Sequence, residues 1–253
     1  MSEELRQFSI LRSEALKRIG NSKVLMVGSG KGGVGKSVVS SLLALELASR
    51  GIDVGLLDAD VHGSSVPAIL GVDKVIRVGK EGFRPIEFEG VMVMSLGLIT
   101  GDEVVPLRGE RKSEVIAWLL SMTDWGDLDY LVVDLPPGTG DEVLSTLRLT
   151  DGLVRRSLAV STPSAVAIRV ARRYVSLMRE EGVDVVGVIN MAYNLDGTPS
   201  LFGEAGDLGV DKVFRLPIDP GVEEFIRGVR SWRDLSDEMV NGVRAIVDEL
   251  VSG

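Results

Sequence analysis

Residues 30–37 read Gly-Lys-Gly-Gly-Val-Gly-Lys-Ser and match the phosphate-binding pattern G-x-x-x-x-G-K-[ST]. An apolar run at residues 24–27 precedes them, and residues 38–49 follow with helical periodicity. A strand, a glycine-rich turn and a helix, in this order, form the context that the pattern requires. The sequence therefore predicts a phosphate-binding loop between the first buried strand and the helix that follows it.

The residue types in this loop suit a polyphosphate ligand. Glycines let backbone N–H groups converge on phosphate oxygens without a clash from Cβ, and the helix N-terminus adds partial positive charge. We expect Lys36 to reach the β- and γ-phosphates of ATP or ADP, and Ser37 to bind Mg²⁺. The predicted nucleotide contacts in the loop are Gly30, Lys31, Gly32, Gly33, Val34, Gly35, Lys36, Ser37 and Val38.

A second pattern overlaps the loop. Gly28, Gly30 and Gly33 fit the dinucleotide fingerprint G-x-G-x-x-G, and Asp58, at the end of the next strand, suits a ribose contact. That pattern leaves the Lys-Ser pair at the end of the loop without a role and predicts nothing downstream. The sequence therefore favours a nucleoside triphosphatase.

The order of strand and helix recurs along the chain. Further buried runs predict strands at 54–57, 91–95, 129–134, 157–161, 185–190 and 212–216, and periodicity predicts helices at 111–122, 140–150, 164–181, 201–208, 221–230 and 235–251. Continuous apolar strands that alternate with helices are typical of a parallel sheet covered on both faces. We therefore predict an α/β fold, a doubly wound and mostly parallel sheet with helices on both faces.

The chain reads as one domain with a short arm. Residues 3–19 form a polar helical pattern with a thin apolar stripe, so residues 1–20 are predicted to be an N-terminal helical arm packed on a single domain at 21–253. Residues 74–90 alternate in polarity around a Gly-Lys-Glu-Gly turn, which predicts a small hairpin insertion.

Carboxylates follow two predicted strands, at the edge where α/β sheets bind ligands. Asp58 and Asp60 come after the second strand, and Asp134 ends the strand at 129–134. Carboxylates beside Mg²⁺ and a triphosphate hold metal-bound water or orient the attacking water. The predicted metal set is Ser37, Asp58, Asp60 and Asp134, with the carboxylates acting through water. A helix N-cap is the alternative for Asp58 or Asp60.

Composition excludes several classes of protein. The 253 residues are 45% hydrophobic, which rules out a disordered chain. No apolar run reaches the ~18–20 residues of a membrane helix, and the charged N-terminus lacks a secretory core, so we expect a cytoplasmic protein without membrane contact. A net charge of −9 makes nucleic-acid binding an unfavoured function. With no cysteine and one histidine, His62, the chain has no thiolate or multi-histidine metal site of its own.

Lys31 follows the first glycine of the loop, and G-K-G-G-x-G-K-S is typical of the deviant Walker A pattern. In this respect the chain resembles the MinD/ParA-like ATPases. The resemblance implies an ATP-dependent homodimer in which Lys31 reaches the ATP of the other subunit, as an arginine finger does. It implies Lys31, Lys36 and Asp60 as catalytic residues, with Asp60 orienting water. It also implies that Asn190 and Pro217 contact the adenine.

Longer segments narrow the resemblance. DADVHGSSVPAILG at 58–71, DWGDLDYLVVDLPPGTGDE at 124–142 and VSTPSAVAIRVARR at 160–173 resemble the Mrp/ApbC-type iron–sulfur carrier ATPases, and the likeness covers about residues 20–230. It implies an ATPase, slow without a partner, that helps to assemble or transfer a [4Fe–4S] cluster for a client or scaffold protein. It also implies that the turn at 136–138 after Asp134 senses the γ-phosphate.

The chain departs from that family at its cluster ligands. The family's C-x-x-C falls where this sequence has Asp196 and Pro199, and the segment at 105–108 is also altered. Because thiolates hold iron–sulfur clusters, we expect no self-held cluster.

Two other functions remain open. One is a MinD/ParA-like switch that positions a protein or DNA cargo, for which Arg169, Arg172 and Arg173, with Arg155 and Arg156 nearby, would form a patch. The other is a non-hydrolysing nucleotide-binding adaptor, which fits poorly with an intact set of lysines and aspartates. The net charge favours a solvated or dimer-facing role for the arginines.

Overall fold

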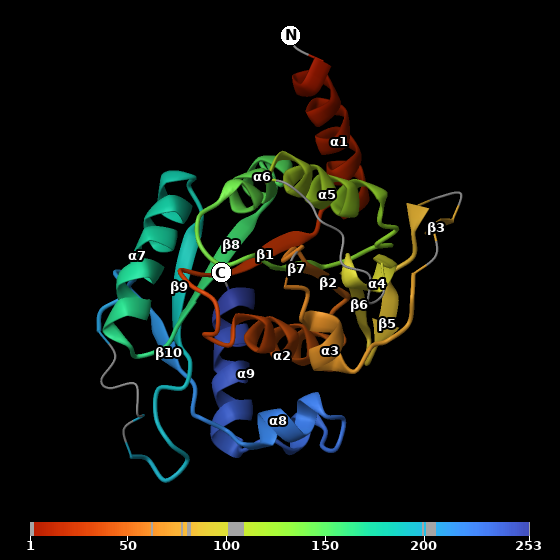
Figure 1. Cartoon of the computed structure of the whole chain (residues 1–253). Helices are drawn as coiled ribbons and strands as arrows, with labels where there is room; N and C mark the ends of the chain where they lie inside the picture. Colours follow the sequence, from red (N-terminus) through yellow and green to blue (C-terminus); the bar gives the residue numbers. More distant parts are fainter. Residues whose placement is uncertain are drawn as a thin grey trace.

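The strand that leads into the phosphate loop lies inside an eight-stranded sheet (Figure 1). The computed structural model describes residues 3–61, 63–76, 78–79, 82–100, 109–198, 200 and 206–252. Across the sheet the strands are β10 (Val213–Arg215), β9 (Asp184–Ile189), β8 (Arg155–Ser161), β1 (Lys23–Ser29), β7 (Tyr130–Asp134), β2 (Val54–Asp58), β6 (Val91–Ser95) and β5 (Ile86–Phe88). Among the strand pairs that the structure describes in this sheet, β5–β6 is antiparallel and the others are parallel. The predicted doubly wound, mostly parallel sheet is confirmed.

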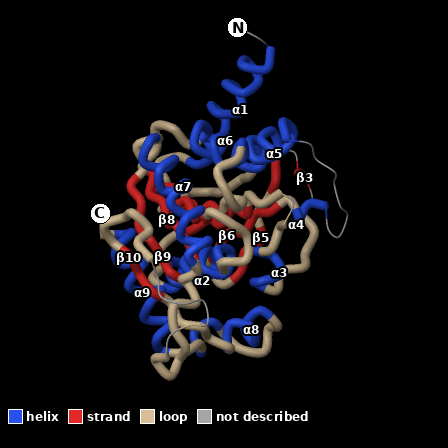
Figure 2. The backbone as a smooth tube through the Cα atoms, turned by 60° about the vertical axis from the view of Figure 1, so that its left-hand side comes forward, coloured by secondary structure: helices blue, strands red, loops and turns tan. Residues whose placement is uncertain are grey.

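Helices cover both faces of the sheet (Figures 1 and 2). On one face lie α2 (Lys36–Ser49), α3 (Val66–Leu70) and α9 (Asp237–Val251), with α8 (Gly221–Ile226) packed beside α3. On the other face lie α5 (Gly109–Met122), α6 (Asp141–Leu149) and α7 (Ala165–Glu180). The central strands are buried on both sides, which explains why they read as continuous apolar runs.

The first helix, α1 (Glu3–Ile19), packs across α5 and α6. Ala15 and Ile19, near its C-terminal end, are buried in the core, and Arg12 donates a hydrogen bond to the Asp151 carbonyl at 2.8 Å. Figure 1 shows the N-terminal end of α1 pointing away from the sheet. The arm is therefore anchored by its C-terminal half.

Two hairpins occupy the region between β2 and β6. β3 (Val78–Gly79) and β4 (Gly82–Phe83) pair as a separate two-stranded sheet, and β5 turns into β6 at the edge of the main sheet. Glu89 and Gly90 both have positive φ, 46° and 83°, as a tight hairpin turn requires. A short helix, α4 (Gly97–Thr100), follows β6.

Two predicted helices differ from the structure. α8 ends at Ile226 rather than at residue 230, because Gly228 adopts a φ of +70° and closes the helix through its N–H to the Phe225 carbonyl. The helix predicted at 201–208 is wrong for residues 206–208, which are not helical, while residues 201–205 lie outside the described residues. After α8 the chain forms a 3₁₀ turn, η1 (Trp232–Asp234), and Ser236 then caps the N-terminus of α9.

The register of the central strands places their carboxyl ends next to one another at one edge of the sheet. Val27 of β1 and Asp58 of β2 both pair with Asp134 of β7. The phosphate loop leaves β1 just beyond this line, so the sheet itself brings the two aspartates beside the loop. Among the described residues, no helix combines the length and apolar character that a bilayer span needs.

Helix α7 presses against the exit of β1. A Cβ on Gly30 would lie 2.2 Å from the carbonyl carbon of Val170, and a Cβ on Gly28 would lie 2.1 Å from the ring of Tyr174. Tyr174 is fully buried, and its hydroxyl hydrogen-bonds Ser157 at 2.8 Å. Gly30 is thus required by packing against a helix backbone.

This contact predicts that alanine substitution will affect stability very differently at two glycines of the same loop. Gly30→Ala should lower the free energy of unfolding by about 1–3 kcal/mol, because backbone atoms of α7 must shift to admit a methyl group. Gly32→Ala should change it by less than about 0.5 kcal/mol, since nothing lies within 4 Å of its added Cβ. Urea unfolding of the nucleotide-free proteins measures both, and equal losses would contradict the packing role of Gly30.

Candidate nucleotide-binding site

A cleft of about 300 Å³ opens at the carboxyl end of β1. The described residues that line it are Ser29, Lys31, Gly32, Gly33, Val34, Gly35, Lys36, Ser37, Val38, Asp60, Gly63, Ser65, Ile69 and Pro137. The structure thus brings residues 31–38 and Asp60 together at one cleft. Gly30 is not among the lining residues and packs against α7 instead.

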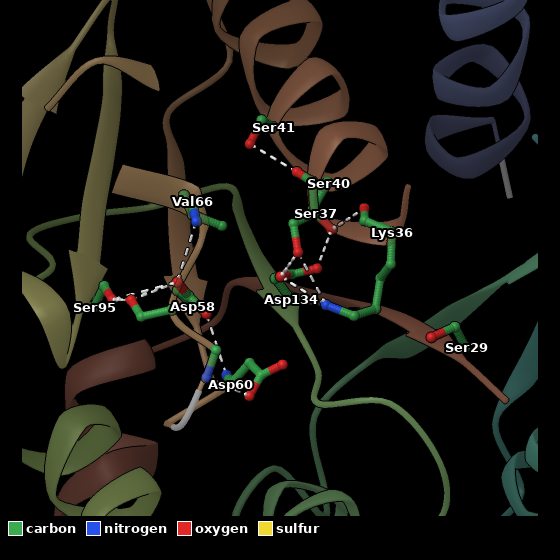
Figure 3. Close-up of polar contacts among 12 residues, drawn as sticks. Ser29, Lys36, Ser37, Ser40, Ser41, Asp58, Asp60, Val66, Ser95 and Asp134 are labelled. Carbon is green, nitrogen blue, oxygen red and sulfur yellow. Dashed lines mark hydrogen bonds and ion pairs between the residues drawn. The ribbon is translucent and has the colours of Figure 1, made fainter. Parts of the chain in front are cut away.

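Behind the cleft, the carboxylate of Asp134 gathers three side chains from the start of α2 (Figure 3). Its Oδ2 lies 2.7 Å from the Lys36 Nζ and accepts a hydrogen bond from the Ser37 hydroxyl at 2.6 Å. Its Oδ1 accepts one from the Ser40 hydroxyl, also at 2.6 Å. Asp134 has no exposed surface and Lys36 is 7% exposed. Burial makes the partnering necessary, since an unpaired charge there would be strongly destabilising.

Asp58 forms a second cluster beside the first (Figure 3). Its Oδ2 accepts hydrogen bonds from the Ser64 hydroxyl at 2.9 Å, the Val66 N–H at 3.2 Å and the Ser95 hydroxyl at 3.3 Å. Its Oδ1 accepts the N–H of Asp60 at 3.1 Å. Both oxygens therefore hold the loop between β2 and α3 in place. A role for Asp58 in the metal shell stays a prediction.

Asp60 reaches the cleft from that loop. Its Oδ1 accepts the N–H of Gly63 at 3.0 Å, and the side chain is half-buried at the cleft wall. Lys31 is exposed at the same cleft. A carboxylate inside the cleft suits the orientation of water, and an exposed lysine suits contact with a second molecule. Both roles stay predictions.

The turn after Asp134 is tied to the loop by backbone bonds. The Gly138 N–H donates to the Ser29 carbonyl at 2.7 Å, and Leu135 N–H donates to the Val27 carbonyl at 2.9 Å. Pro137 lines the cleft, and Gly138 has a φ of +95°. The Gly138 N–H thus has a protein acceptor, so a phosphate-sensing role for this turn needs another group or a rearrangement.

Asn190 and Pro217 lie on neighbouring segments and are not among the residues that line the cleft. The Leu216 N–H donates to the Ile189 carbonyl and the Leu216 carbonyl accepts the Ala192 N–H, at 2.9 and 2.8 Å. Asn190 uses its side-chain nitrogen to donate to the Val34 carbonyl at 2.9 Å. The predicted adenine contacts are untested by this arrangement.

The donor set suits Mg²⁺ held together with phosphate and water. Mg²⁺ prefers oxygen ligands and is usually bound through one or two carboxylates, several waters and substrate phosphates. Ser37 and Asp134 supply two such oxygens, 2.6 Å apart, at the edge of the glycine loop. No group of three or more His, Cys, Asp or Glu side chains in the described part of the chain could hold a metal ion. The site thus fits a metal that arrives with a nucleotide.

Sequence patterns missed the serines of this site. Ser40, Ser64 and Ser95 all donate to a buried aspartate, yet no motif singles them out. The position of Ser40 could have been recognised from the sequence, because it falls one helical turn after the loop, on the face that meets β7. Ser95 lies 37 residues from Asp58, so its role depends on the pairing of β2 with β6.

The remaining predicted positions lie apart from the cleft. Asp196 is exposed in a turn, where hydrogen bonds from the Thr198 hydroxyl and N–H lower the pKa of its carboxyl. Pro199, His62 and the segment 105–108 lie outside the described residues. Arg155 donates hydrogen bonds to the carbonyls of Leu147 and of Glu181 at the end of α7, and Arg156 donates to those of Glu249 and Leu250 in α9. A patch formed with α7 stays a prediction.

Known proteins resemble this chain in sequence and in fold. A ParA family model, described as NUBPL iron-transfer P-loop NTPase, matches residues 20–217. The chain belongs to this iron-transfer P-loop NTPase family. The cytosolic Fe-S cluster assembly factor NUBP2 homolog of Trichoplax adhaerens is 35% identical, covering 94% of this chain and 98% of that protein. The iron-sulfur cluster carrier protein of Aquifex aeolicus is 39% identical, covering 81% of this chain and 60% of its own length.

Solved structures have folds similar to that of this chain. A nucleotide-binding protein from Archaeoglobus fulgidus, in complex with ADP, has a TM-score of 0.71 and 32% identity, covering 87% of this chain and 91% of that one. The cell division ATPase MinD of Pyrococcus furiosus has a TM-score of 0.68 at 18% identity, covering 90% and 99%. The second likeness shows the fold alone. The resemblance to iron–sulfur carrier ATPases is confirmed.

The buried Asp58 predicts a pH dependence of stability. Burial, and then the nearby negative Asp134, raise the pKa of Asp58 to about 7, against hydrogen bonds from Ser64 and the charge of Lys36. Above about pH 4 the unfolded chain holds this carboxyl ionised, so the folded protein binds the extra proton. Its contribution to stability is therefore present below about pH 4 and is lost as pH rises through about 7.

Asp58→Asn removes this titration. Urea unfolding of both proteins from pH 5 to pH 8, without metal, should show the wild type losing stability relative to the variant as pH rises. A constant difference across that range would contradict the raised pKa.

Proposed function

We propose that this protein binds Mg-ATP at the P-loop cleft and hydrolyses ATP as a nucleotide-switched homodimer. We further propose that it assists iron–sulfur cluster assembly or transfer without cluster ligands of its own. The observation that carries the first proposal is the convergence of Lys36, Ser37 and Asp134 behind a glycine loop. That arrangement unites a phosphate-binding cation with two oxygens suited to Mg²⁺.

Each residue has a distinct task in this proposal. Lys36 supplies positive charge for the terminal phosphates, while Ser37 and Asp134 would hold the metal. Bound Mg²⁺ neutralises charge on the phosphate oxygens and so lowers the barrier to phosphoryl transfer. Asp60, in the cleft wall, orients the attacking water. Lys31, exposed at the cleft, adds charge to the site of a second subunit.

The iron–sulfur part of the proposal depends on family membership and on composition. The relatives carry names of cluster carriers and of a cluster assembly factor, and the family is described by iron transfer. The whole sequence contains no cysteine. Because clusters are held mainly by thiolates, the thiolates must come from a partner protein, and this chain would supply the ATP-driven step.

Two lysines separate nucleotide binding from turnover. Lys36→Ala should weaken ATP binding strongly, because it removes the buried cation beside the phosphate site, whereas Lys31→Ala should keep ATP binding and lose turnover. Calorimetric titration with Mg-ATP and phosphate release assays measure the two effects. Lys212→Ala is the control for loss of a lysine, because the Lys212 side chain is exposed and lies just before β10.

Two outcomes would overturn these assignments. Tight ATP binding by Lys36→Ala would remove the P-loop assignment. Wild-type turnover by Lys31→Ala would leave Lys31 as a solvated loop residue and remove the argument for a shared site.

The cluster proposal predicts a pair of results. Anaerobic incubation of the isolated protein with iron and sulfide should give no visible cluster absorbance. Asp60→Ala protein, which should bind ATP without hydrolysing it and accumulate as a dimer, should retain cysteine-rich or iron–sulfur proteins from lysate with ATP and release them with ADP. Wild-type protein in the same two nucleotides is the control.

Other captured proteins would redirect the assignment. Retention of DNA-associated or membrane proteins in place of iron–sulfur proteins would support a positioning switch and contradict the cluster role. An Asp60→Ala protein that stays monomeric with ATP on light scattering would contradict the homodimer.

A further inference from the structure

Asn190 touches the phosphate loop from behind. It directly follows β9 and is 6% exposed. Its side-chain Nδ2 donates a hydrogen bond to the Val34 carbonyl at 2.9 Å, and its backbone N–H donates to the Ser161 carbonyl at 2.7 Å. The backbone bond fixes Asn190 on the end of β8, so its side chain is held against the loop by the sheet.

Gly35 shows how closely the two segments approach. A Cβ built on Gly35 would lie 2.2 Å from Nδ2 of Asn190, and Gly35 has a φ of +81°. The loop therefore has a glycine at the place where the Asn190 amide meets its backbone. This close approach agrees with the hydrogen bond and indicates direct packing of the amide on the Val34–Gly35 peptide.

The peptide plane converts this contact into an effect on the cleft. In a trans peptide the carbonyl oxygen of Val34 and the N–H of Gly35 point in opposite directions, and the described residues contain no cis peptide. Because Asn190 holds the carbonyl, the Gly35 N–H points away from Asn190. Gly35 lines the cleft and Asn190 does not. The N–H is thereby aimed toward the side where a phosphate would lie.

We propose that Asn190 is a positioning residue for the phosphate loop, which orients the Val34–Gly35 peptide so that its N–H serves a phosphate oxygen. The proposal rests on nucleotide binding at this cleft, as set out above. It states that Asn190 supports any polyphosphate ligand, whatever base that ligand carries. This differs from the adenine contact that the sequence resemblance implies for Asn190.

Hydrogen exchange tests the positioning role without any ligand. In Asn190→Ala the Val39 amide, whose N–H donates to the Gly35 carbonyl at 3.0 Å, should exchange faster than in the wild type, because the Val34–Gly35 peptide loses the side chain that holds it. The matched control is Asn241→Ala, which removes an exposed amide from α9. Unchanged exchange of α9 and β8 in the same experiment shows that the variant is folded. Wild-type exchange of the Val39 amide in Asn190→Ala would overturn the proposal.

Ligands without adenine give the second test. Asn190→Ala should bind ATP, GTP and inorganic tripolyphosphate, each with Mg²⁺, about 3- to 10-fold more weakly than the wild type, as expected for loss of one buried hydrogen bond. The ratio of GTP to ATP affinity should stay the same. Asn190→Asp keeps the side-chain shape and places an oxygen opposite the Val34 carbonyl, so it should weaken all three at least as much.

The binding results distinguish failure of the positioning role of Asn190 from failure of nucleotide binding at the cleft. Weakened binding of ATP alone, with GTP and tripolyphosphate unaffected, would assign Asn190 to the base and overturn the positioning role. Failure of the wild-type protein to bind any of the three would refute nucleotide binding at the cleft. In that case the exchange experiment still decides whether Asn190 orders the loop.

Discussion

A buried carboxylate organises this protein. Asp134 has no contact with solvent, so its charge must be balanced inside the protein. The first turns of α2 supply the Lys36 ammonium and the hydroxyls of Ser37 and Ser40. These groups reach Asp134 only if α2 starts directly after the glycine loop and β7 lies beside β1. A buried ion pair adds little net stability, but loss of one partner is costly. The interaction therefore fixes a position more than it strengthens the fold.

A second carboxylate divides the site into two parts. Asp58 pairs in register with Asp134 across β2 and β7, yet its bonds go to the loop that carries Asp60 and to Ser95 on β6. One aspartate thus holds the phosphate loop and its helix, and the other holds the opposite wall of the cleft. Burial, and then the negative charge of Asp134, raise the pKa of Asp58, so the two parts are linked electrostatically. A change of charge at Asp134 therefore alters the protonation of Asp58.

Local sequence patterns predicted most of the fold and the cleft. The phosphate loop, the buried strands and Asp134 are read from short runs, because strand burial and glycine geometry are local properties. Ser40 and Ser95 were missed because their partners lie 94 and 37 residues away and depend on strand order. The predicted end of α8 was wrong for another reason, since the positive φ of Gly228 ends a helix that periodicity would continue.

If Asp134 couples the glycine loop to Mg²⁺, ATP affinity should depend on Mg²⁺ through this carboxylate. A titration of ATP at a series of Mg²⁺ concentrations, in the wild type and in Asp134→Asn, measures this dependence. Ser41→Ala is the control, because Ser41 is also buried on α2 but donates to the Ser37 carbonyl instead. We expect Mg²⁺ to strengthen ATP binding in the wild type and in Ser41→Ala, and we expect Asp134→Asn to lose this dependence. An Asp134→Asn protein whose ATP affinity rises with Mg²⁺ as in the wild type would contradict this coupling.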